Sequence, residues 1–329
     1  MNILVVGGAG YIGSHMVRYL ADGTGHRAVA LDDLSRGHRD AVIGAELVVG
    51  DYGDAALVER LCREQEIGAV MHFGAASLVA ESVANPAKYY EDNVVKGKRL
   101  IDAALAAGVR RVIFSSTAAV YGIPERVPIP EDAQTQPINP YGHTKLAFEG
   151  LLDNYAGAYG LQYISLRYFN AAGSDPGGRI GEDHTPETHL IPLALRVALG
   201  QRPAITIYGD DYLTPDGTCI RDYVHVTDLV AAHLLALERL AAGGPSGVYN
   251  LGSGQGFSVK EILDVCRKVT GHPIPAETGP RRPGDPAVLV AGAERAREEL
   301  GWQPVLTSMH DIVATAWRWQ QAYPDGYVV

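Results

Sequence analysis

The stretch NILVVGGAGYIGSH, residues 2–15, constrains the fold more than any other part of the sequence. Residues 2–7 predict a buried β-strand, and a helix is expected over about residues 11–21. Gly7, Gly10 and Gly13 run from the end of this strand into the first turn of the helix. These glycines permit a tight turn and let backbone N–H groups approach a pyrophosphate at the N-terminus of the helix. A strand, a glycine-rich turn and a helix in this order predict a dinucleotide-binding unit.

Apolar strands alternate with helical patterns through the first half of the chain. Further strands are expected at residues 27–33, 45–51, 67–75, 110–117 and 162–170. Helices are expected at residues 55–65 and 85–108 and from about residue 141 onward. Pro86 and Gly108 stand where a long helix begins and ends. Buried strands alternating with helices predict an α/β fold with a doubly wound parallel sheet, the Rossmann arrangement.

The character of the sequence changes after Asn170. AAGSDPGGRIGEDHTPETHLIP is a loop rich in Gly, Pro and charge, and it is too long for a simple connection. Further elements are expected at residues 190–199 (helix), 204–209 (strand), 220–240 (strand and helix) and 258–271 (helix). We expect a smaller, discontinuous α/β domain that binds the substrate. The expected boundaries are 1–169 plus 221–251 for the dinucleotide-binding domain and 170–220 plus 252–329 for the second.

Charge and composition exclude several classes of protein. A net charge of −10 argues against a nucleic-acid partner, and no apolar run approaches the length of a membrane span. A strand at residue 2 leaves no basic segment for a signal peptide. The three cysteines are scattered, so we expect reduced, buried thiols in a cytoplasmic protein.

No metal site is expected from the histidines of the sequence. The histidines concerned are His184, His189, His225 and His233. Their spacing does not match that of the common zinc-binding motifs.

Two acidic residues end predicted strands and are candidates for cofactor contacts. Asp32 ends the second strand, where a carboxylate bonds the ribose 2′-hydroxyl of NAD and repels the 2′-phosphate of NADP. The alternative for Asp32 is a residue of a surface turn. Asp51 ends the third strand in GDYGD, where it is positioned to accept from an adenine amino group. The alternative for Asp51 is a helix cap.

Tyr141 and Lys145 stand four residues apart in NPYGHTK, at the expected start of a helix. Such a pair is either a surface contact worth a few tenths of a kcal/mol or a tyrosine base whose pKa is lowered by a nearby ammonium. The dinucleotide loop upstream favours the second reading. Thr117 ends the fifth strand, where parallel sheets place reacting groups, and its hydroxyl is expected to relay the substrate proton to Tyr141.

The motifs together resemble the extended short-chain dehydrogenase/reductase family, and within it the UDP-glucose (UDP-galactose) 4-epimerases. The resemblance runs from residue 7 to about residue 291 and covers nearly the whole chain. The matching stretches, in family order, are GGAGYIGSH, HFGAASLVAESV, SSTAAVYG, NPYGHTK, LRYFNAAGS, GEDHTPETHLIP, DGTCIRDYVHV, YNLGSG and RRPGDPAVLVA.

The resemblance implies an isomerase of galactose metabolism that uses NAD and nets no redox change. It implies that Tyr141 removes the O4 proton of a UDP-hexose while C4 gives hydride to NAD. The 4-keto sugar would then turn about its phosphate linkage, and hydride would return to its other face. UDP-glucose and UDP-galactose would be interconverted, and the N-acetylhexosamine forms are a further expectation. Family members also pair two helices per subunit in a homodimer, so the helix at residues 85–108 is expected at such an interface.

The resemblance also implies a set of site residues. The residues implied in catalysis are Tyr141, Lys145 and Thr117. Those implied in cofactor binding are Gly7, Gly10, Tyr11, Ile12, Gly13, Asp32, Asp51, Tyr52, Phe73, Ala75, Ser77, Asn93, Ser115, Tyr141, Lys145 and Tyr168. Those implied in substrate binding are Thr117, Tyr141, Asn170, His189, Leu190, Tyr208, Arg221, Arg282, Asp285 and Leu289. Within this last set the arginines would bind the diphosphate, Asp285 the uridine ribose and Tyr208 the uracil.

Three positions depart from the pattern of some family members. Ser77 stands where some members have a lysine that helps to hold the cofactor. His189 stands where others carry an asparagine that contacts the substrate. Leu289 aligns with a tyrosine that blocks N-acetylated sugars, so UDP-GlcNAc and UDP-GalNAc are expected to fit.

Several other functions compete with this one. A 4,6-dehydratase or decarboxylase is disfavoured because AAVYG, with no acid, follows Thr117. A UDP-glucuronate 4-epimerase or a nucleotide-sugar ketoreductase uses the same three catalytic residues and stays open. A non-catalytic NAD-sensing protein would need neither Tyr141 nor Lys145, and both are present.

Overall fold

The computed structural model describes residues 1–282 and 285–327. Within these residues the larger sheet has seven strands in the order β10-β6-β5-β4-β1-β2-β3, and every pairing in it is parallel. Its strands are β1 (Asn2–Val6), β2 (Arg27–Asp32), β3 (Glu46–Val49), β4 (Ile67–His72), β5 (Arg111–Thr117), β6 (Gln162–Tyr168) and β10 (Gly247–Leu251). The predicted doubly wound parallel sheet is confirmed.

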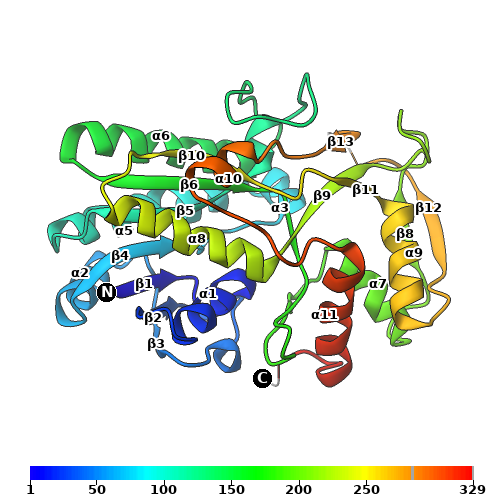
Figure 1. Ribbon diagram of the computed structural model, residues 1–329, viewed down its shortest axis with the longest axis horizontal. Coiled ribbons are helices and arrows are strands. Elements are labelled where there is room, and N and C mark those ends of the chain that lie inside the picture. Colours follow the sequence, from blue (N-terminus) through cyan, green and yellow to red (C-terminus); the bar gives the residue numbers. More distant parts are fainter. Residues whose placement is uncertain (283–284, 328–329) are drawn as a thin grey trace.

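Helices cover both faces of this sheet (Figure 1). They are α1 (Tyr11–Ala21), α2 (Ala55–Glu64), α3 (Val79–Ala84), α4 (Pro86–Tyr90), α5 (Gly97–Ala106), α6 (Pro140–Tyr159) and α8 (Val226–Ala241). On one face, α1 and α8 bury Met16, Leu20 and Leu237 against the strands. On the other, α2, α5 and α6 bury a second apolar cluster that includes Leu100 and Phe148. Two cores separated by one sheet account for the continuous apolar strands of the sequence.

The long helix expected at residues 85–108 is continuous but not uniform. It runs through α4, a π-helical segment η2 (Glu91–Lys96) and α5. Asn85 caps its start with Pro86 in the first turn, and Gly108 adopts a φ of +88° beyond its end. The punctuation predicted from Pro86 and Gly108 is therefore correct. The π segment was not predicted, because the apolar pattern continues through it.

The remaining elements pack beside the large sheet, on the right of Figure 1. A smaller sheet joins β7 (Asn170–Ala172), β9 (Ile220–His225), β11 (Gly256–Ser258) and β13 (Val288–Leu289), and β8 (Ile205–Tyr208) pairs with β12 (Ala276–Gly279). The helices here are α7 (Leu190–Ala198), α9 (Val259–Thr270) and α11 (Met309–Ala322), whereas α10 (Glu294–Glu299) packs against β10 of the large sheet. Short 3₁₀ turns complete the chain at η1 (Arg39–Ala41) and η3 (Ala118–Tyr121). A third apolar cluster unites α7, α9 and α11.

One expected domain boundary needs correction. Residues 221–225 were expected to belong with the dinucleotide-binding sheet, but β9 pairs with β7, β11 and β13 in the smaller sheet. The return to the larger sheet comes with α8 and β10. The strand pattern of β9 cannot reveal its neighbours, because the pairing depends on distant segments. We keep the two-domain division as a proposal, with its second segment starting at Val226.

A separate property concerns membranes. In the two described ranges, every helix is too short or too polar to cross a lipid bilayer.

Candidate active site

The candidate site lies at the carboxyl ends of the parallel strands. The glycine turn follows β1, Asp32 ends β2, and Thr117 ends β5. The β5 and β6 strands are paired so that Thr117 lies opposite Tyr168. Parallel strands bring residues from these separate parts of the sequence to one edge, where open α/β sheets bind their ligands.

The glycine turn leaves no room for side chains at two of its positions. Gly7 has a φ of +75°, and a Cβ there would lie 2.6 Å from the backbone nitrogen of Gly74. A Cβ on Gly13 would lie 1.9 Å from the carbonyl oxygen of Gly7. A Cβ on Gly10 would lie 3.4 Å from that same oxygen, which is ordinary contact. The turn therefore needs glycine at both ends for its own packing, as the sequence predicts.

The first turn of α1 fits a bound pyrophosphate. Among the described residues, none caps this helix with a side chain, and its first turn carries no acidic residue. The first N–H groups of a helix lack acceptors within the helix and, together with the helix dipole, favour an anion. Tyr11, Ile12 and Gly13 supply these groups.

Asp32 is buried, with 9% of its surface exposed. Its two carboxylate oxygens accept hydrogen bonds from the backbone N–H groups of Ala9 and Leu34, each at 2.9 Å. Burial raises the pKa of the carboxyl, and the backbone donors oppose that rise. Each oxygen keeps a lone pair for a further donor, so Asp32 fits the expected ribose contact better than the alternative of a surface turn.

Asp51 does not cap the helix that follows it. The cap of α2 is Asp54, whose carboxylate accepts from the N–H groups of Ala56 and Leu57. Asp51 instead pairs with Lys96 at 2.8 Å. Burial alone would raise its pKa, but the bond with Lys96 brings the pKa below its ordinary value. The cap alternative for Asp51 is thereby excluded.

Tyr141 and Lys145 are not a surface pair. They lie in the first turns of α6, and their exposed fractions are 9% and 3%. The Lys145 ammonium donates to the carbonyl oxygen of Ser115 at 2.8 Å and lies 6.0 Å from the centre of the Tyr141 ring. The edge of β5 thus holds the lysine beside the tyrosine, and the reading of a solvated i,i+4 contact fails.

Burial shifts the pKa values of this pair in opposite directions. It raises the pKa of Tyr141 well above its ordinary value, against a hydrogen-bonding effect of the Thr117 hydroxyl. It lowers the pKa of Lys145 to about 7, against the negative charge of Glu149. Burial therefore works against the charged form of each group, because charge is costly in a dry site. A positive charge beside Tyr141 would lower the pKa of Tyr141, because it favours the ionised phenolate.

A hydrogen-bonded chain holds the start of α6 in place. Asn139 caps the helix by accepting from the N–H of Gly142 at 2.9 Å, and the Thr144 hydroxyl donates to the carbonyl of Tyr141 at 2.8 Å. Asn93, within the π segment η2, donates to the Thr144 hydroxyl at 3.0 Å. Asn93 also exchanges two hydrogen bonds with the backbone of Ala76. The π segment therefore links the loop after β4 to the helix that carries Tyr141.

Other predicted cofactor residues surround this centre. Tyr52 donates to the carbonyl of Asp92 at 2.6 Å, and Ser77 is exposed in the loop after β4. The Ser115 hydroxyl bonds His233 at 3.1 Å, and the His233 ring packs 4.7 Å from that of Phe73. Sequence reasoning assigned no role to His233, Thr144 or Glu149. The spacing of Glu149, one turn beyond Lys145 on α6, is the only sequence signal that could have identified any of them.

The predicted substrate residues form two groups. Arg221 and Asp285 are ion-paired, and Leu289 lies opposite Arg221 in the β9–β13 register. Arg282 lies over the ring of Tyr208, 4.1 Å from its centre. These residues come from four separate segments of the chain.

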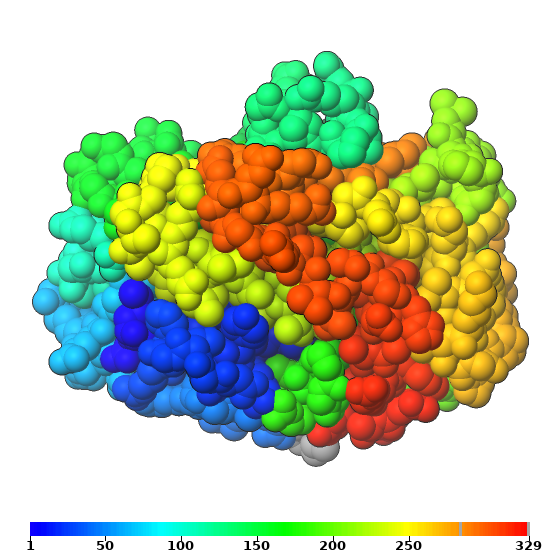
Figure 2. All heavy atoms as spheres, viewed as in Figure 1, coloured from blue at the N-terminus to red at the C-terminus, as the bar shows by residue number. Residues whose placement is uncertain are grey.

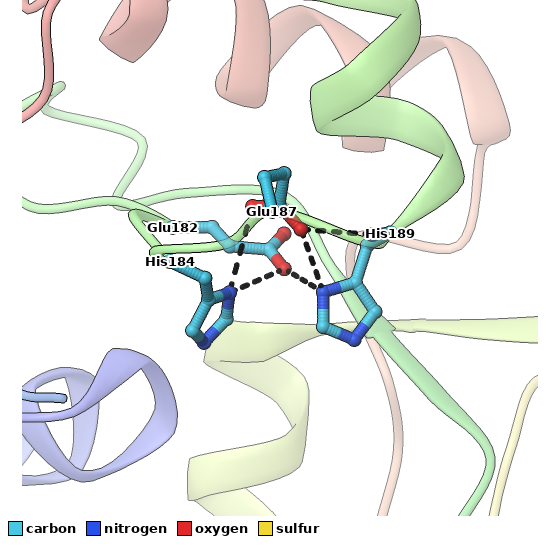
Figure 3. Close-up of side chains that lie close together, drawn as sticks. All are labelled: Glu182, His184, Glu187 and His189. Carbon is cyan, nitrogen blue, oxygen red and sulfur yellow. Dashed lines mark hydrogen bonds and ion pairs between the residues drawn. The ribbon is translucent and has the colours of Figure 1, made fainter. Parts of the chain in front are cut away.

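The remaining predicted substrate residues are Asn170, His189 and Leu190. Asn170 donates to the carbonyl of Asp222 at 2.9 Å. His189 immediately precedes α7, and Leu190 is its first residue. His189 lies against Glu182 and Glu187. His184 lies in the same cluster, an association that the spacing of the histidines did not suggest (Figure 3).

The fold and the site define a dinucleotide-dependent enzyme with a tyrosine–lysine pair at the edge of a Rossmann sheet. Residues 3–252 match the model of the NAD dependent epimerase/dehydratase family. The chain belongs to this family. NAD is accordingly its cofactor, and the glycine turn, the open start of α1 and Asp32 are the residues that fit it.

Similar proteins cover the chain from end to end. A UDP-glucose 4-epimerase of Halalkalibacterium halodurans is 54% identical over 99% of this chain and 98% of its own. The crystal structure of UDP-glucose 4-epimerase from Brucella ovis in complex with NAD has a TM-score of 0.94 at 49% identity, covering 96% of this chain and 97% of its own. The UDP-Glc/GlcNAc 4-epimerase of Campylobacter jejuni has a TM-score of 0.85 at 40% identity, covering 98% and 99%.

The glycine turn gives a testable prediction. We expect Gly13→Ala to lower the free energy of unfolding by about 1–3 kcal/mol, because the new methyl group meets a backbone oxygen, and to weaken NAD binding at least about tenfold. Urea denaturation and NAD titration measure the two effects.

Gly150→Ala is the matched control, since Gly150 lies exposed in α6 with nothing within 4 Å of its Cβ position. This control should raise stability by about 0.5–1 kcal/mol. Equal NAD affinity in wild type and Gly13→Ala would contradict the assignment.

Proposed function

We propose that this enzyme interconverts UDP-glucose and UDP-galactose by reversible oxidation at C4 of the hexose. The observation that carries the proposal is the buried Tyr141–Lys145 pair, held beside Thr117 at the strand edge that also carries the dinucleotide turn. The similarity to named UDP-glucose 4-epimerases over the whole chain supports the choice of substrate.

In this proposal Tyr141 is the base that takes the O4 proton, and Thr117 relays it. NAD, when bound, supplies reversible hydride acceptance at the carbinol carbon and places a positive ring in the site. Burial raises the pKa of Tyr141, so ionisation there depends on positive charge nearby. Lys145 is the residue that provides it from within the chain, with its ammonium fixed on the Ser115 carbonyl.

The smaller domain holds the nucleotide while the sugar turns. Arg221 and Arg282 would bind the diphosphate, since guanidinium groups match phosphate oxygens in two-pronged hydrogen bonds. Asp285 would accept from the uridine ribose, and Tyr208 would stack on uracil. Firm contacts to the nucleotide and loose contacts to the hexose let the 4-keto sugar present either face to the base. The outcome is inversion at C4.

Two finer expectations belong to the same proposal. We infer a homodimer formed through the α4–η2–α5 helix, on which Tyr90 and Val95 expose apolar side chains. A cytoplasmic location is consistent with three free, buried cysteines.

The direct test incubates the purified protein with UDP-galactose and no added NAD, and separates the products by ion-pair chromatography. UDP-glucose is the expected product, formed with cofactor carried through purification. Product that appears only with added NAD would support the chemistry and point to Ser77 as a weak cofactor contact. No product under either condition would refute the proposal for these substrates.

Leu289 supports N-acetylhexosamines as a second class of substrate. Leucine is smaller than the tyrosine that some family members carry there, so UDP-GlcNAc is expected to be epimerised as well. The same assay with UDP-GlcNAc tests this, and Leu289→Tyr should abolish that activity while sparing UDP-galactose. Turnover of UDP-glucuronate in place of both would favour the uronate epimerase.

A further inference from the structure

Two histidines and two glutamates converge in the loop between β7 and α7. Glu182, His184, Glu187 and His189 come from the single stretch EDHTPETH, and their potential ligand atoms all lie within 4.8 Å of one another (Figure 3). The stretch has no helix or strand of its own until α7 begins at Leu190. The order E-x-H-x-x-E-x-H is not a common zinc motif, and the folding of the loop, not the spacing, brings the four together.

The nitrogen–oxygen separations within the cluster are compatible with ligands arranged around one metal ion. The Nδ1 atom of His184 lies 3.3 Å from Glu182 Oε1 and 3.5 Å from Glu187 Oε2. The Nδ1 atom of His189 lies 2.7 Å from Glu182 Oε1 and 3.1 Å from Glu187 Oε1. In a tetrahedral zinc site, nitrogen and oxygen ligands at about 2.0–2.1 Å from the metal are about 3.3 Å from each other. Three of the four separations lie close to that edge length.

The cluster also contains buried polar atoms that lack hydrogen bonds. The side chains of Glu182 and Glu187 are 7% and 1% exposed. Among the described residues, Glu182 Oε1, Glu187 Oε2 and the Nδ1 of His184 make no well-aligned hydrogen bond, although each lies within 3.5 Å of another side chain of the cluster. Buried polar atoms are nearly always partnered in native proteins, and these three face the centre of the cluster (Figure 3).

The charges of the cluster also favour a cation between the two carboxylates. Two buried carboxylates side by side need two compensating positive charges. A single dication with two neutral imidazoles balances both carboxylates and also gives every unpartnered atom a ligand bond.

We propose that Glu182, His184, Glu187 and His189 bind one divalent transition-metal ion. Imidazole and carboxylate ligands in a tetrahedral arrangement suit Zn²⁺. The four protein ligands complete the coordination shell, so the site is structural and leaves no position for a reacting water.

The place of the cluster in the fold gives the ion its role. The His184 ring packs edge-on against Tyr11 of the cofactor turn, with ring centres 6.2 Å apart, and the Tyr11 hydroxyl donates to the carbonyl of Gly173 at 2.6 Å. Asp183 accepts from the N–H of Tyr327 at 3.0 Å. The segment lies between the N-terminal and C-terminal parts of the chain, drawn green between blue and red in Figure 2. A bound ion would fix this segment, and with it the start of α7, against the cofactor turn.

The test uses the full chain, stripped of metal by dialysis against a chelator. Titration with Co²⁺ should reach one ion per chain and give the intense visible bands of four-coordinate cobalt, and Zn²⁺ should displace it. Thermal unfolding should occur at a higher temperature with the ion than without it. Glu182→Gln and His184→Ala should each lower metal affinity at least about tenfold, by analogy with the loss of one ligand bond. His310→Ala is the matched control, because His310 is an exposed histidine beside one carboxylate, Asp311, and it should bind one ion as the wild type does.

A further variant distinguishes loss of a ligand from loss of the fold. His184→Cys supplies a thiolate at the same position and should restore binding, with a cobalt–thiolate absorption that only direct coordination produces. Absence of metal binding by the wild-type chain would overturn the proposal. Binding that persists in both Glu182→Gln and His184→Ala would overturn it as well. Metal content is read without turnover, so neither result depends on the proposed epimerase activity.

Discussion

We expect Tyr141→Phe to lower kcat for UDP-galactose by about 10²–10⁴-fold, the usual contribution of a positioned general base. The substitution removes one oxygen from a buried side chain whose ring stays in contact with its neighbours. Stability and NAD binding should therefore stay near those of the wild type, and the loss should fall on kcat. Steady-state kinetics, with NAD content measured on the same preparation, separate these effects.

Tyr249→Phe is the control for this substitution. Tyr249 is also fully buried on the large sheet, and its hydroxyl donates to Glu299 at 2.8 Å. Removing that hydroxyl should cost about 1 kcal/mol of stability and leave kcat nearly unchanged. If Tyr141→Phe retained more than about a tenth of wild-type kcat, Tyr141 would not be the base, and the proton would have to leave through another group.

We expect Glu149→Gln to lower the free energy of unfolding by about 3–5 kcal/mol. Glu149 and Arg167 form a two-pronged ion pair with N–O distances of 3.0 and 2.6 Å, and their side chains are 6% and 7% exposed. The neutral amide would leave Arg167 as an uncompensated buried charge. Urea denaturation of the two proteins at pH 7 measures the difference.

An exposed pair of the same chemistry provides the control. Glu59 and Arg63 are paired at 2.7 Å on the outer face of α2, and Glu59→Gln should change stability by less than about 1 kcal/mol. The double substitution of Glu149 and Arg167 by leucine and methionine should recover much of the loss, because the buried charge goes with its partner. A loss from Glu149→Gln no larger than that from Glu59→Gln would show that Arg167 finds other partners.

Glu149 also connects stability with the site. Its negative charge opposes the effect of burial on the pKa of Lys145. In Glu149→Gln the lysine should therefore lose its proton at a lower pH, so kcat should suffer more than the stability loss alone explains. A shift of the alkaline limb of the pH–rate profile to lower pH would not follow from a purely structural role.

Local sequence patterns were sufficient for the elements that depend on neighbours along the chain. The turn at Gly7 and Gly13 follows from steric limits within a few residues. The expected strand ends correctly placed Asp32 and Thr117 at one edge, because parallel strands align their carboxyl ends. The helix α6 begins at Pro140, one residue before the start predicted near residue 141.

Contacts between segments far apart in the chain could not be predicted from the sequence. The membership of β9 in the smaller sheet depends on strands far from it in the chain. The link from Asn93 to Thr144 crosses from the π segment to α6, and the partner of Glu149 stands on β6. Residues of these types are also common on exposed surfaces. The type of a residue therefore does not predict which distant residue it contacts.

The sequence by itself determined the parallel sheet, the dinucleotide turn and the four-residue spacing that sets Tyr141 one helical turn from Lys145. Only the tertiary structure decided that this pair is buried, that the Lys145 ammonium is fixed on Ser115, and that Glu182, His184, Glu187 and His189 face one centre. The physical reason is the same in each case. Periodicity and turn geometry act over a few residues, whereas burial and charge pairing depend on which distant segments the fold brings into contact.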